Sequence, residues 1–154
     1  MRSVTSTMMN ASAARIYELA HCTERWPEFL PHYRFVRVIE DDGIKRTVEM
    51  AARRGAIPLR WTAVQSNDPN TYGIHFLHIR GWTRGMNVDW ILEEHAGRTK
   101  VSIVHDVVFH FPIARKLLEQ HLVTHYFIEG IASRTLACIK SLVEDNDLCK
   151  SDVL

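Results

Sequence analysis

The side chain with the clearest capacity for acid–base chemistry in this 154-residue sequence is that of His105. It alternates with Val101, Ile103, Val107 and Phe109, so we expect it on the covered face of a strand. Imidazole gains or loses a proton near neutral pH and can therefore move protons to or from a bound molecule. A second interpretation stays open, in which His105 is a core residue whose ring is satisfied by a backbone carbonyl or by neighbouring Tyr or Gln side chains.

Two further histidines, His121 and His125, are four residues apart on what we expect to be the covered face of a helix. This spacing can chelate zinc, but a zinc site needs a third ligand and usually a carboxylate behind it. The segment reads His-Leu-Val-Thr-His and lacks the glutamate of a HExxH motif. We therefore expect both histidines to line a cavity or contact a sheet, and we expect no metal and no other cofactor.

Large aromatic side chains form a second group of candidates: Trp26, Tyr33, Trp61 and Trp90. Each could be an ordinary core residue, but as a set they can line a pocket for an apolar ligand. The Tyr33 hydroxyl needs a hydrogen-bond partner when it is buried, and a ligand could supply one.

Turn signals divide the middle of the chain into runs of about ten residues rich in Val, Ile, Thr and Trp, which is typical of antiparallel strands joined by short loops. The turns fall at 41–43, 54–55, 67–70, 80–85 and 95–97. A strand at 3–9 precedes this region. It is followed by a helix that Asn10 or Ser12 can cap, and by a short helix or turn at 23–31 where Pro27 and Pro31 prevent one continuous helix.

After Pro112 the apolar period changes to that of a helix, which predicts one long amphipathic helix from Ile113 to about Glu144. The expected class is α+β, with a curved antiparallel sheet of about seven strands around that helix and two short helices after the first strand. We expect one domain at 1–145 and a polar tail at 146–154. A helix laid across a concave sheet cannot touch it everywhere, so we expect an internal cavity.

The composition argues against several classes of function. With 19 Lys+Arg against 18 Asp+Glu the formal net charge is +1, which gives no electrostatic basis for binding nucleic acid. No apolar run approaches the ~18 residues of a membrane-spanning helix. Cys22, Cys138 and Cys149 are odd in number and widely spaced, which favours reduced thiols in a cytoplasmic protein.

One segment carries a resemblance to a known family. Residues 24–33 read Glu-Arg-Trp-Pro-Glu-Phe-Leu-Pro-His-Tyr and resemble the Trp-Pro segment of bacterial aromatase/cyclases and a similar segment of coenzyme Q-binding proteins. Trp61, residues 86–90 (Met-Asn-Val-Asp-Trp) and residues 139–145 extend the similarity over nearly the whole chain. The chain thus resembles the polyketide cyclase/dehydrase family of the helix-grip superfamily, which includes START domains and birch-pollen allergens. The resemblance implies a helix-grip fold with a ligand cavity.

The resemblance also implies roles for individual residues. In aromatase/cyclases the equivalents of the four aromatic residues lie in or beside the cavity, where they would hold a poly-β-ketone. An arginine that polarises a carbonyl or stabilises an enolate there aligns with Gln65, and the nearby Arg60 has the opposite strand parity. A neutral amide stabilises an enolate less than a cation does.

Three functions remain open, of which the third is a protein-binding accessory module that docks through its sheet edge or the loop around Trp82. In the first, the protein promotes ring closure of a polyketone, with Tyr33, Gln65 and His105 orienting carbonyls or relaying protons. In the second, it is a non-catalytic carrier of a lipid, a quinone or an aromatic metabolite. The ligand-binding residues expected in either case are Trp26, Trp61, Trp90, Ile103, Met50, Trp82, His121 and His125.

The loop Arg80 to Gly85 places Trp82 between two arginines and two glycines. It is either a hairpin loop with a packed tryptophan or a gate at the cavity mouth that touches a membrane surface or an acyl carrier protein. Arg53, Arg54 and Arg60 could extend a basic rim toward such a partner. We expect a monomer or a homodimer.

Overall fold

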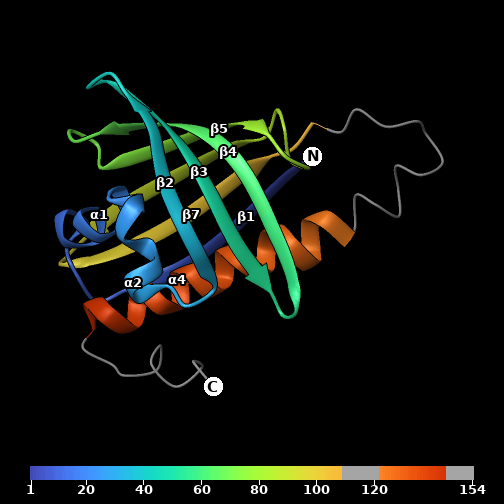
Figure 1. Ribbon diagram of the computed structural model, residues 1–154. Helices are drawn as coiled ribbons and strands as arrows, with labels where there is room; N and C mark the ends of the chain where they lie inside the picture. The colour runs from blue at the N-terminus through green and yellow to red at the C-terminus, as the bar shows by residue number, and fades with distance from the viewer. Residues whose placement is uncertain (109–121, 145–154) are drawn as a thin grey trace.

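The computed structural model describes residues 1–108 and 122–144 of the chain (Figure 1). The elements are, in order, β1 (Arg2–Met9), α1 (Ala13–His21), η1 (Thr23–Arg25), α2 (Trp26–Phe29), β2 (Tyr33–Asp41), β3 (Lys45–Arg54), β4 (Ile57–Asp68), β5 (Gly73–Arg80), β6 (Asn87–His95), β7 (Arg98–Asp106), η2 (Leu122–Ile128) and α4 (Glu129–Val143).

The strands form one seven-stranded sheet in the order β1-β7-β6-β5-β4-β3-β2, and every neighbouring pair is antiparallel. The sheet curves so that β2 to β4 lie in front of β7 and β1 in Figure 1, while α4 crosses its lower side. The core lies between the concave face and the helices. The predicted fold class, a curved antiparallel sheet with a long C-terminal helix, is confirmed.

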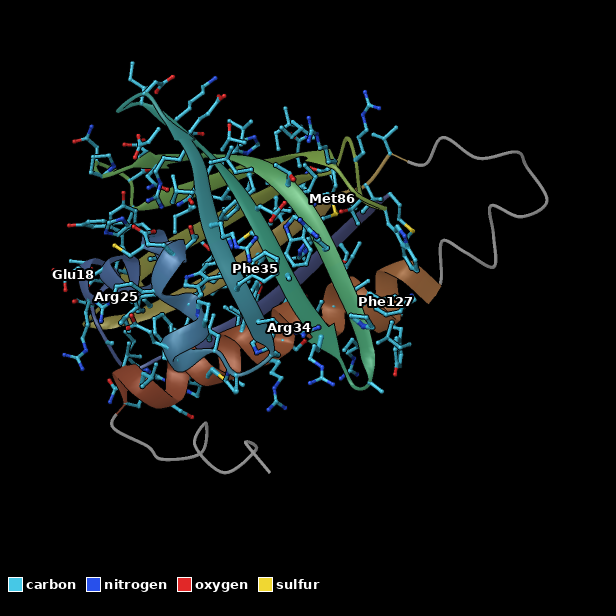
Figure 2. All side chains as sticks on the ribbon, in the orientation of Figure 1. Glu18, Arg25, Arg34, Phe35, Met86 and Phe127 are labelled. Carbon is cyan, nitrogen blue, oxygen red and sulfur yellow. The ribbon has the colours of Figure 1, made fainter. Side chains whose placement is uncertain are left out.

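The first helix begins where the sequence provides a cap. The Ser12 hydroxyl accepts a hydrogen bond from the backbone N–H of Arg15 at 3.3 Å, which satisfies one of the free amides of the first turn. Ile16 and Ala20 point into the core, whereas Glu18 lies on the exposed face (Figure 2). Pro27 lies in the first turn of α2, so the predicted break between the two helices is confirmed.

The described part of the C-terminal helix begins at Leu122 with a π-helical segment, and α4 follows. In α4 the buried side chains recur every three or four residues, at Ala132, Thr135, Ile139 and Val143, as the predicted amphipathic pattern requires. The expected helical segment 113–121 lies outside the described residues. No helix within 1–108 and 122–144 is long and apolar enough to cross a membrane.

The cysteines differ from the expectation of three reduced thiols. Cys22 is a free thiol at the end of α1, but Cys138 in α4 is disulfide-bonded. An odd number of cysteines with wide spacing indicated free thiols, and sequence spacing alone does not report which cysteines meet in space. The prediction is therefore wrong for Cys138.

The hairpin between β5 and β6 contains the Trp82 loop, which we define as residues 81–85. The loop is folded back on the end of β5, because Gly85 N–H donates to the carbonyl of His78 at 2.8 Å and Met86 N–H donates to that of Thr83 at 2.9 Å. Gly81 has φ +102°, and a Cβ there would lie 2.8 Å from the Arg60 carbonyl oxygen. The loop therefore packs directly against the backbone of β4.

Gly81→Ala should destabilise the protein more than Gly97→Ala. Both glycines have positive φ, +102° and +78°. Either alanine therefore costs left-handed strain of about 1–2 kcal/mol. Only the Gly81 variant also collides with a neighbouring backbone, since nothing lies within 4 Å of a Cβ at Gly97. Overpacking of this kind adds about 1–3 kcal/mol. Urea unfolding measures both variants, and equal losses would contradict the packing of the Trp82 loop on β4.

Candidate ligand-binding cavity

A cavity of about 280 Å³ lies between the concave face of the sheet and the C-terminal helix. Its volume is near the lower limit of about 300–1,000 Å³ that small-molecule sites show. The walls are mostly apolar and come from α2, β2 to β7, the Trp82 loop, η2 and α4. The lining residues are Trp26, Tyr33, Met50, Pro58, Leu59, Arg60, Trp61, Phe76, His78, Trp82, Thr83, Met86, Val88, Trp90, Ile103, His105, Phe127, Ile128, Ile131, Ala132 and Thr135.

The four aromatic residues singled out in the sequence meet at this cavity. The ring centroid of Trp26 lies 5.0 Å from that of Tyr33 and 5.8 Å from that of Trp90. Tyr33 in turn lies 6.1 Å from Trp61 in an edge-to-face arrangement. The Trp26 indole donates its N–H to the carbonyl of Ala20 at 3.1 Å, so its polar atom is satisfied within the protein. The expected ligand-binding residues Met50 and Ile103 also line the cavity.

Tyr33 is buried and belongs to a short chain of hydrogen-bonded polar side chains beside α4. Burial raises the pKa of its hydroxyl above the usual 10, and a hydrogen bond with the Thr135 side chain opposes this shift. The Thr135 hydroxyl donates to the carbonyl of Ile131 at 2.8 Å and also lies 2.8 Å from His32 Nε2. Because the Thr135 proton is already used, His32 Nε2 carries a proton and donates it to this oxygen. Tyr33 is therefore a neutral hydroxyl held in place at the cavity wall.

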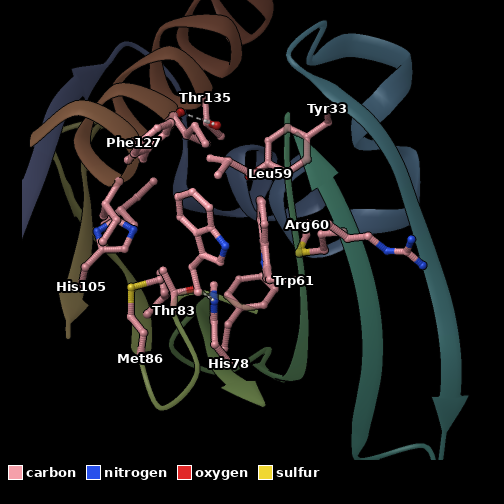
Figure 3. Close-up of a pocket in the computed structure, with 18 of the residues that line it drawn as sticks. Tyr33, Leu59, Arg60, Trp61, His78, Thr83, Met86, His105, Phe127 and Thr135 are labelled. Carbon is pink, nitrogen blue, oxygen red and sulfur yellow. Dashed lines mark hydrogen bonds between the residues drawn. The ribbon is translucent and has the colours of Figure 1, made fainter. Parts of the chain in front are cut away.

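His105 reaches the cavity from β7 and is 6% exposed (Figure 3). Its Nδ1 is buried, and no residue in the described part of the chain gives it a hydrogen bond. Burial lowers the pKa of His105 to about 4, against a weaker raising effect of Glu129 and Asp106. The imidazole is therefore neutral near pH 7. A buried ring with an unpaired nitrogen is the kind of group that a water or a bound molecule satisfies.

His78 is a cavity residue whose direction the sequence did not reveal. It comes from β5, and its ring stacks on Trp61 with centroids 5.7 Å apart and an interplanar angle of 5°. Its Nδ1 lies 2.6 Å from the Thr83 hydroxyl of the Trp82 loop. Burial and, more weakly, the nearby His105 together lower the pKa of His78 to about 3. Alternation from Ile74 through Phe76 could have placed His78 on their face of the strand. Because both faces of this segment are apolar, the sequence does not show which face is covered.

Gln65 lies outside the cavity lining, on the part of β4 that faces α1 and η1. Its side chain is 1% exposed and joins four groups. The amide nitrogen donates to the carbonyl of His21 and to Asn67 Oδ1, both at 2.8 Å. The amide oxygen accepts from the Thr23 hydroxyl at 2.8 Å and from Arg46 Nη2 at 3.2 Å. Gln65 thus attaches the first helices to the sheet.

The residues that the sequence placed at the cavity mouth or on the covered helix face do not all lie where they were expected. The Trp82 side chain is 71% exposed, but it lines the cavity edge and meets Phe127 at 6.1 Å between centroids. Arg60 also lies at the rim, with its guanidinium pointing away from the cavity and 2.8 Å from a Glu49 oxygen (Figure 3). The expectation that His125 faces the covered side is wrong, because its side chain is 62% exposed and pairs with Glu129 at 3.0 Å.

The π-helical winding of η2 explains this difference, since it rotates side chains relative to the regular helix that the sequence pattern assumed. His121 lies outside the described residues. Among residues 1–108 and 122–144, no three His, Cys, Asp or Glu side chains are arranged to hold a metal ion.

Comparisons with known proteins agree with this architecture. A family described as "Polyketide cyclase / dehydrase and lipid transport" matches residues 9–122. No sequence among the curated proteins matches the chain significantly.

Among solved structures, TTHA0849 from Thermus thermophilus is similar with 18% identity and a TM-score of 0.80, covering 94% of this chain and 98% of that one. The ZhuI aromatase/cyclase from Streptomyces sp. R1128 has 15% identity and a TM-score of 0.72, covering 92% and 95%. A START superfamily protein from Mycobacterium smegmatis has 13% identity and a TM-score of 0.65, covering 94% and 97%. At these identities the similarity shows the helix-grip fold.

Gln65→Leu should destabilise the protein without weakening ligand binding in the cavity. The variant removes the buried acceptor of the Thr23 hydroxyl and one of the two donors to the His21 carbonyl, which Arg46 Nη2 also reaches at 3.1 Å, at a cost of about 1–3 kcal/mol. Ser66→Ala, on the opposite face of the same strand, is the control and should change the free energy of unfolding by less than about 0.5 kcal/mol. Selective loss of binding in a stably folded Gln65→Leu protein would contradict the structural role.

Stability should fall as the pH is lowered from about 6.5 toward 4. The pKa values of His32, His78 and His105 are lowered to about 4, 3 and 4, so the unfolded chain takes up protons before the folded protein does. Each histidine then removes up to about 1.4 kcal/mol per pH unit. Urea unfolding between pH 7.5 and 5 measures the loss, and His78→Gln should reduce the slope. A flat profile over this range would contradict neutral, buried imidazoles.

Proposed function

Because the chain belongs to the polyketide cyclase/dehydrase and lipid transport family, we propose that it binds a polyketone in the internal cavity and promotes its ring closure. One observation carries the proposal: a neutral imidazole and a neutral phenol, those of His105 and Tyr33, face the same mostly apolar cavity. This arrangement offers a proton acceptor and a hydrogen-bond donor in a mostly apolar site.

The reaction that these groups fit is an intramolecular aldol condensation. His105 accepts a proton from a methylene between two carbonyls, and the resulting enolate carbon forms a C–C bond with a carbonyl farther along the chain. The imidazolium then returns its proton to the new alkoxide, so no proton is consumed. Burial opposes a lone imidazolium, but here it forms together with an enolate, and the two opposite charges compensate each other.

Tyr33 contributes a positioned donor. Its hydroxyl lies at the wall formed by β2 and α4, where it would turn its one proton from the Thr135 oxygen to the substrate carbonyl that gains negative charge. Trp26, Trp61 and Trp90 enclose the site and would fold the substrate by shape, because flat rings stack on planar enol and aryl groups. Gln65 has no part in this chemistry, since its amide is fully used between the sheet and the first helices.

One observation favours the alternative of a non-catalytic carrier for a lipid, a quinone or an aromatic metabolite. Among the lining residues of the described chain, the only permanent charge is Arg60, whose guanidinium is 65% exposed and paired with Glu49. An enolate would therefore form without a buried cation beside it. A carrier needs no such cation. For either function, Trp82 and the adjacent Arg80 and Arg84 would meet an acyl carrier protein or a membrane surface at the rim.

The test begins with native mass spectrometry and organic extraction of the freshly purified protein, followed by a turnover assay with a linear poly-β-ketone thioester. His105→Gln should lower the cyclisation rate by about 10²–10⁴-fold, as removal of a general base does. Tyr33→Phe should lower it by about 10²-fold through loss of one donor. His95→Gln, an exposed histidine at the end of β6, is the matched control and should leave the rate unchanged.

Unchanged turnover in both cavity variants would contradict the catalytic assignment. A quinone or lipid recovered in stoichiometric amount, together with no turnover by the unmodified protein, would identify the carrier instead.

A further inference from the structure

His78 takes no part in the proposed ring closure, yet the structure presents it to the same cavity. The ring is buried between Trp61, on which it stacks, and the Trp82 loop, whose Thr83 hydroxyl lies 2.6 Å from Nδ1. These contacts fix the position and the orientation of the imidazole. They also use only one of its two nitrogens, so Nε2 is left to interact with whatever enters the cavity.

His78 and His105 face the cavity from the same side. The sheet register pairs Phe76 of β5 with Val88 of β6, and Val88 with His105 of β7. His78 follows Phe76 by two residues and therefore points to the same face of the sheet as His105. Figure 3 shows both rings at the cavity with Met86 and Thr83 close to them. A molecule inside the cavity thus meets two imidazoles at once.

Both imidazoles are uncharged, and neither has a carboxylate hydrogen-bonded to it in the described part of the chain. A neutral imidazole can donate or accept a hydrogen bond, depending on the tautomer, and so can pair with a hydroxyl or with a carbonyl oxygen. It cannot neutralise a carboxylate. An anionic ligand would have to lose its hydration in a site whose described lining holds no buried cation, which is costly.

The apolar walls of the cavity determine which ligand shapes fit. Stacked against Trp61, His78 extends a flat surface, and the cavity volume of about 280 Å³ favours a compact molecule of one or two fused rings. We propose that His78 is the specificity-determining residue of this cavity: together with His105 it selects uncharged aromatic ligands that carry a hydroxyl or carbonyl oxygen, and it disfavours carboxylates. The inference rests on one part of the proposed function, namely that the ligand binds in this cavity.

Three matched probes test the inference: 2-naphthol, naphthalene and 2-naphthoate, titrated at pH 7.5 and followed by tryptophan fluorescence and calorimetry. The unmodified protein should bind 2-naphthol at least about tenfold more tightly than naphthalene, which corresponds to one net hydrogen bond. It should bind 2-naphthoate at least about tenfold more weakly than 2-naphthol, because the carboxylate stays unpaired.

The variant His78→Phe keeps an aromatic ring next to Trp61 but removes both nitrogens. It should lose most of the preference for 2-naphthol over naphthalene, because only His105 is left to pair with the hydroxyl. Its affinity for naphthalene should change by less than about threefold, since shape and apolar contact are kept. His75→Phe is the matched control, because it makes the same change on the same strand at a half-exposed residue paired with Asp89 at 2.6 Å on the other face. It should retain the preference for 2-naphthol. His78→Gln keeps a hydrogen-bonding group and should recover part of that preference.

The inference would be overturned if the unmodified protein bound all three probes equally, bound 2-naphthoate most tightly or bound none of them. An unchanged preference for 2-naphthol in a folded His78→Phe variant would also overturn it. If His78→Phe does not fold, the three affinities of the unmodified protein and of His78→Gln decide the question. Selectivity for 2-naphthol without any cyclisation would contradict the proposed reaction alone. Cyclisation without that selectivity would contradict only the role of His78.

Discussion

A single helix that crosses a curved sheet can contact it only along part of its length, and the other features of this protein depend on how the remaining space is closed. Here α4 packs closely on β1 at the edge of the sheet, and large side chains enclose the space between α4 and the central strands. Trp26, Tyr33, Trp61 and Trp90 can meet there because each comes from a different element. The cavity is therefore a consequence of the architecture, and its chemistry is decided by the few polar side chains that replace apolar ones in its wall.

Enclosure also sets the charge state of those polar groups. Removing an imidazole from water penalises its cationic form, so His78 and His105 are bases that stay neutral far below the pH at which exposed histidines take up protons. The same desolvation keeps Tyr33 protonated. Inside the rim residue Arg60, the described wall of the cavity thus offers hydrogen-bonding groups without charge, which suits both a ring-closing reaction of a neutral polyketone and the binding of an oxygenated aromatic compound. A buried cation would have suited an anionic ligand or a strongly stabilised enolate.

The sequence predicted the features that depend on periodicity and turns. The α+β class and the succession of strands follow from the turn signals and the change of apolar period, and the placement of His105 toward the covered face follows from alternation along its strand, since a period of two assigns each residue to a face. Trp61 was expected at the cavity from the family resemblance. Where local pattern carries no such information, the direction of His78 stayed open, and His125 and Gln65 do not lie where they were expected. His78 lies on a segment apolar on both faces, His125 was displaced by a π-helical turn, and Gln65 points to the first helices because the curvature of the sheet directs the far end of β4 toward them.

The most direct test of the central claim is nitrogen-15 NMR of the imidazole rings at pH 7, with and without 2-naphthol. The account predicts that His78 and His105 both show the shifts of neutral imidazole with one protonated nitrogen, and that both sets of shifts move when the ligand binds while those of exposed His95 do not. Imidazolium shifts at pH 7, or bound 2-naphthol that leaves both rings unchanged, would contradict it.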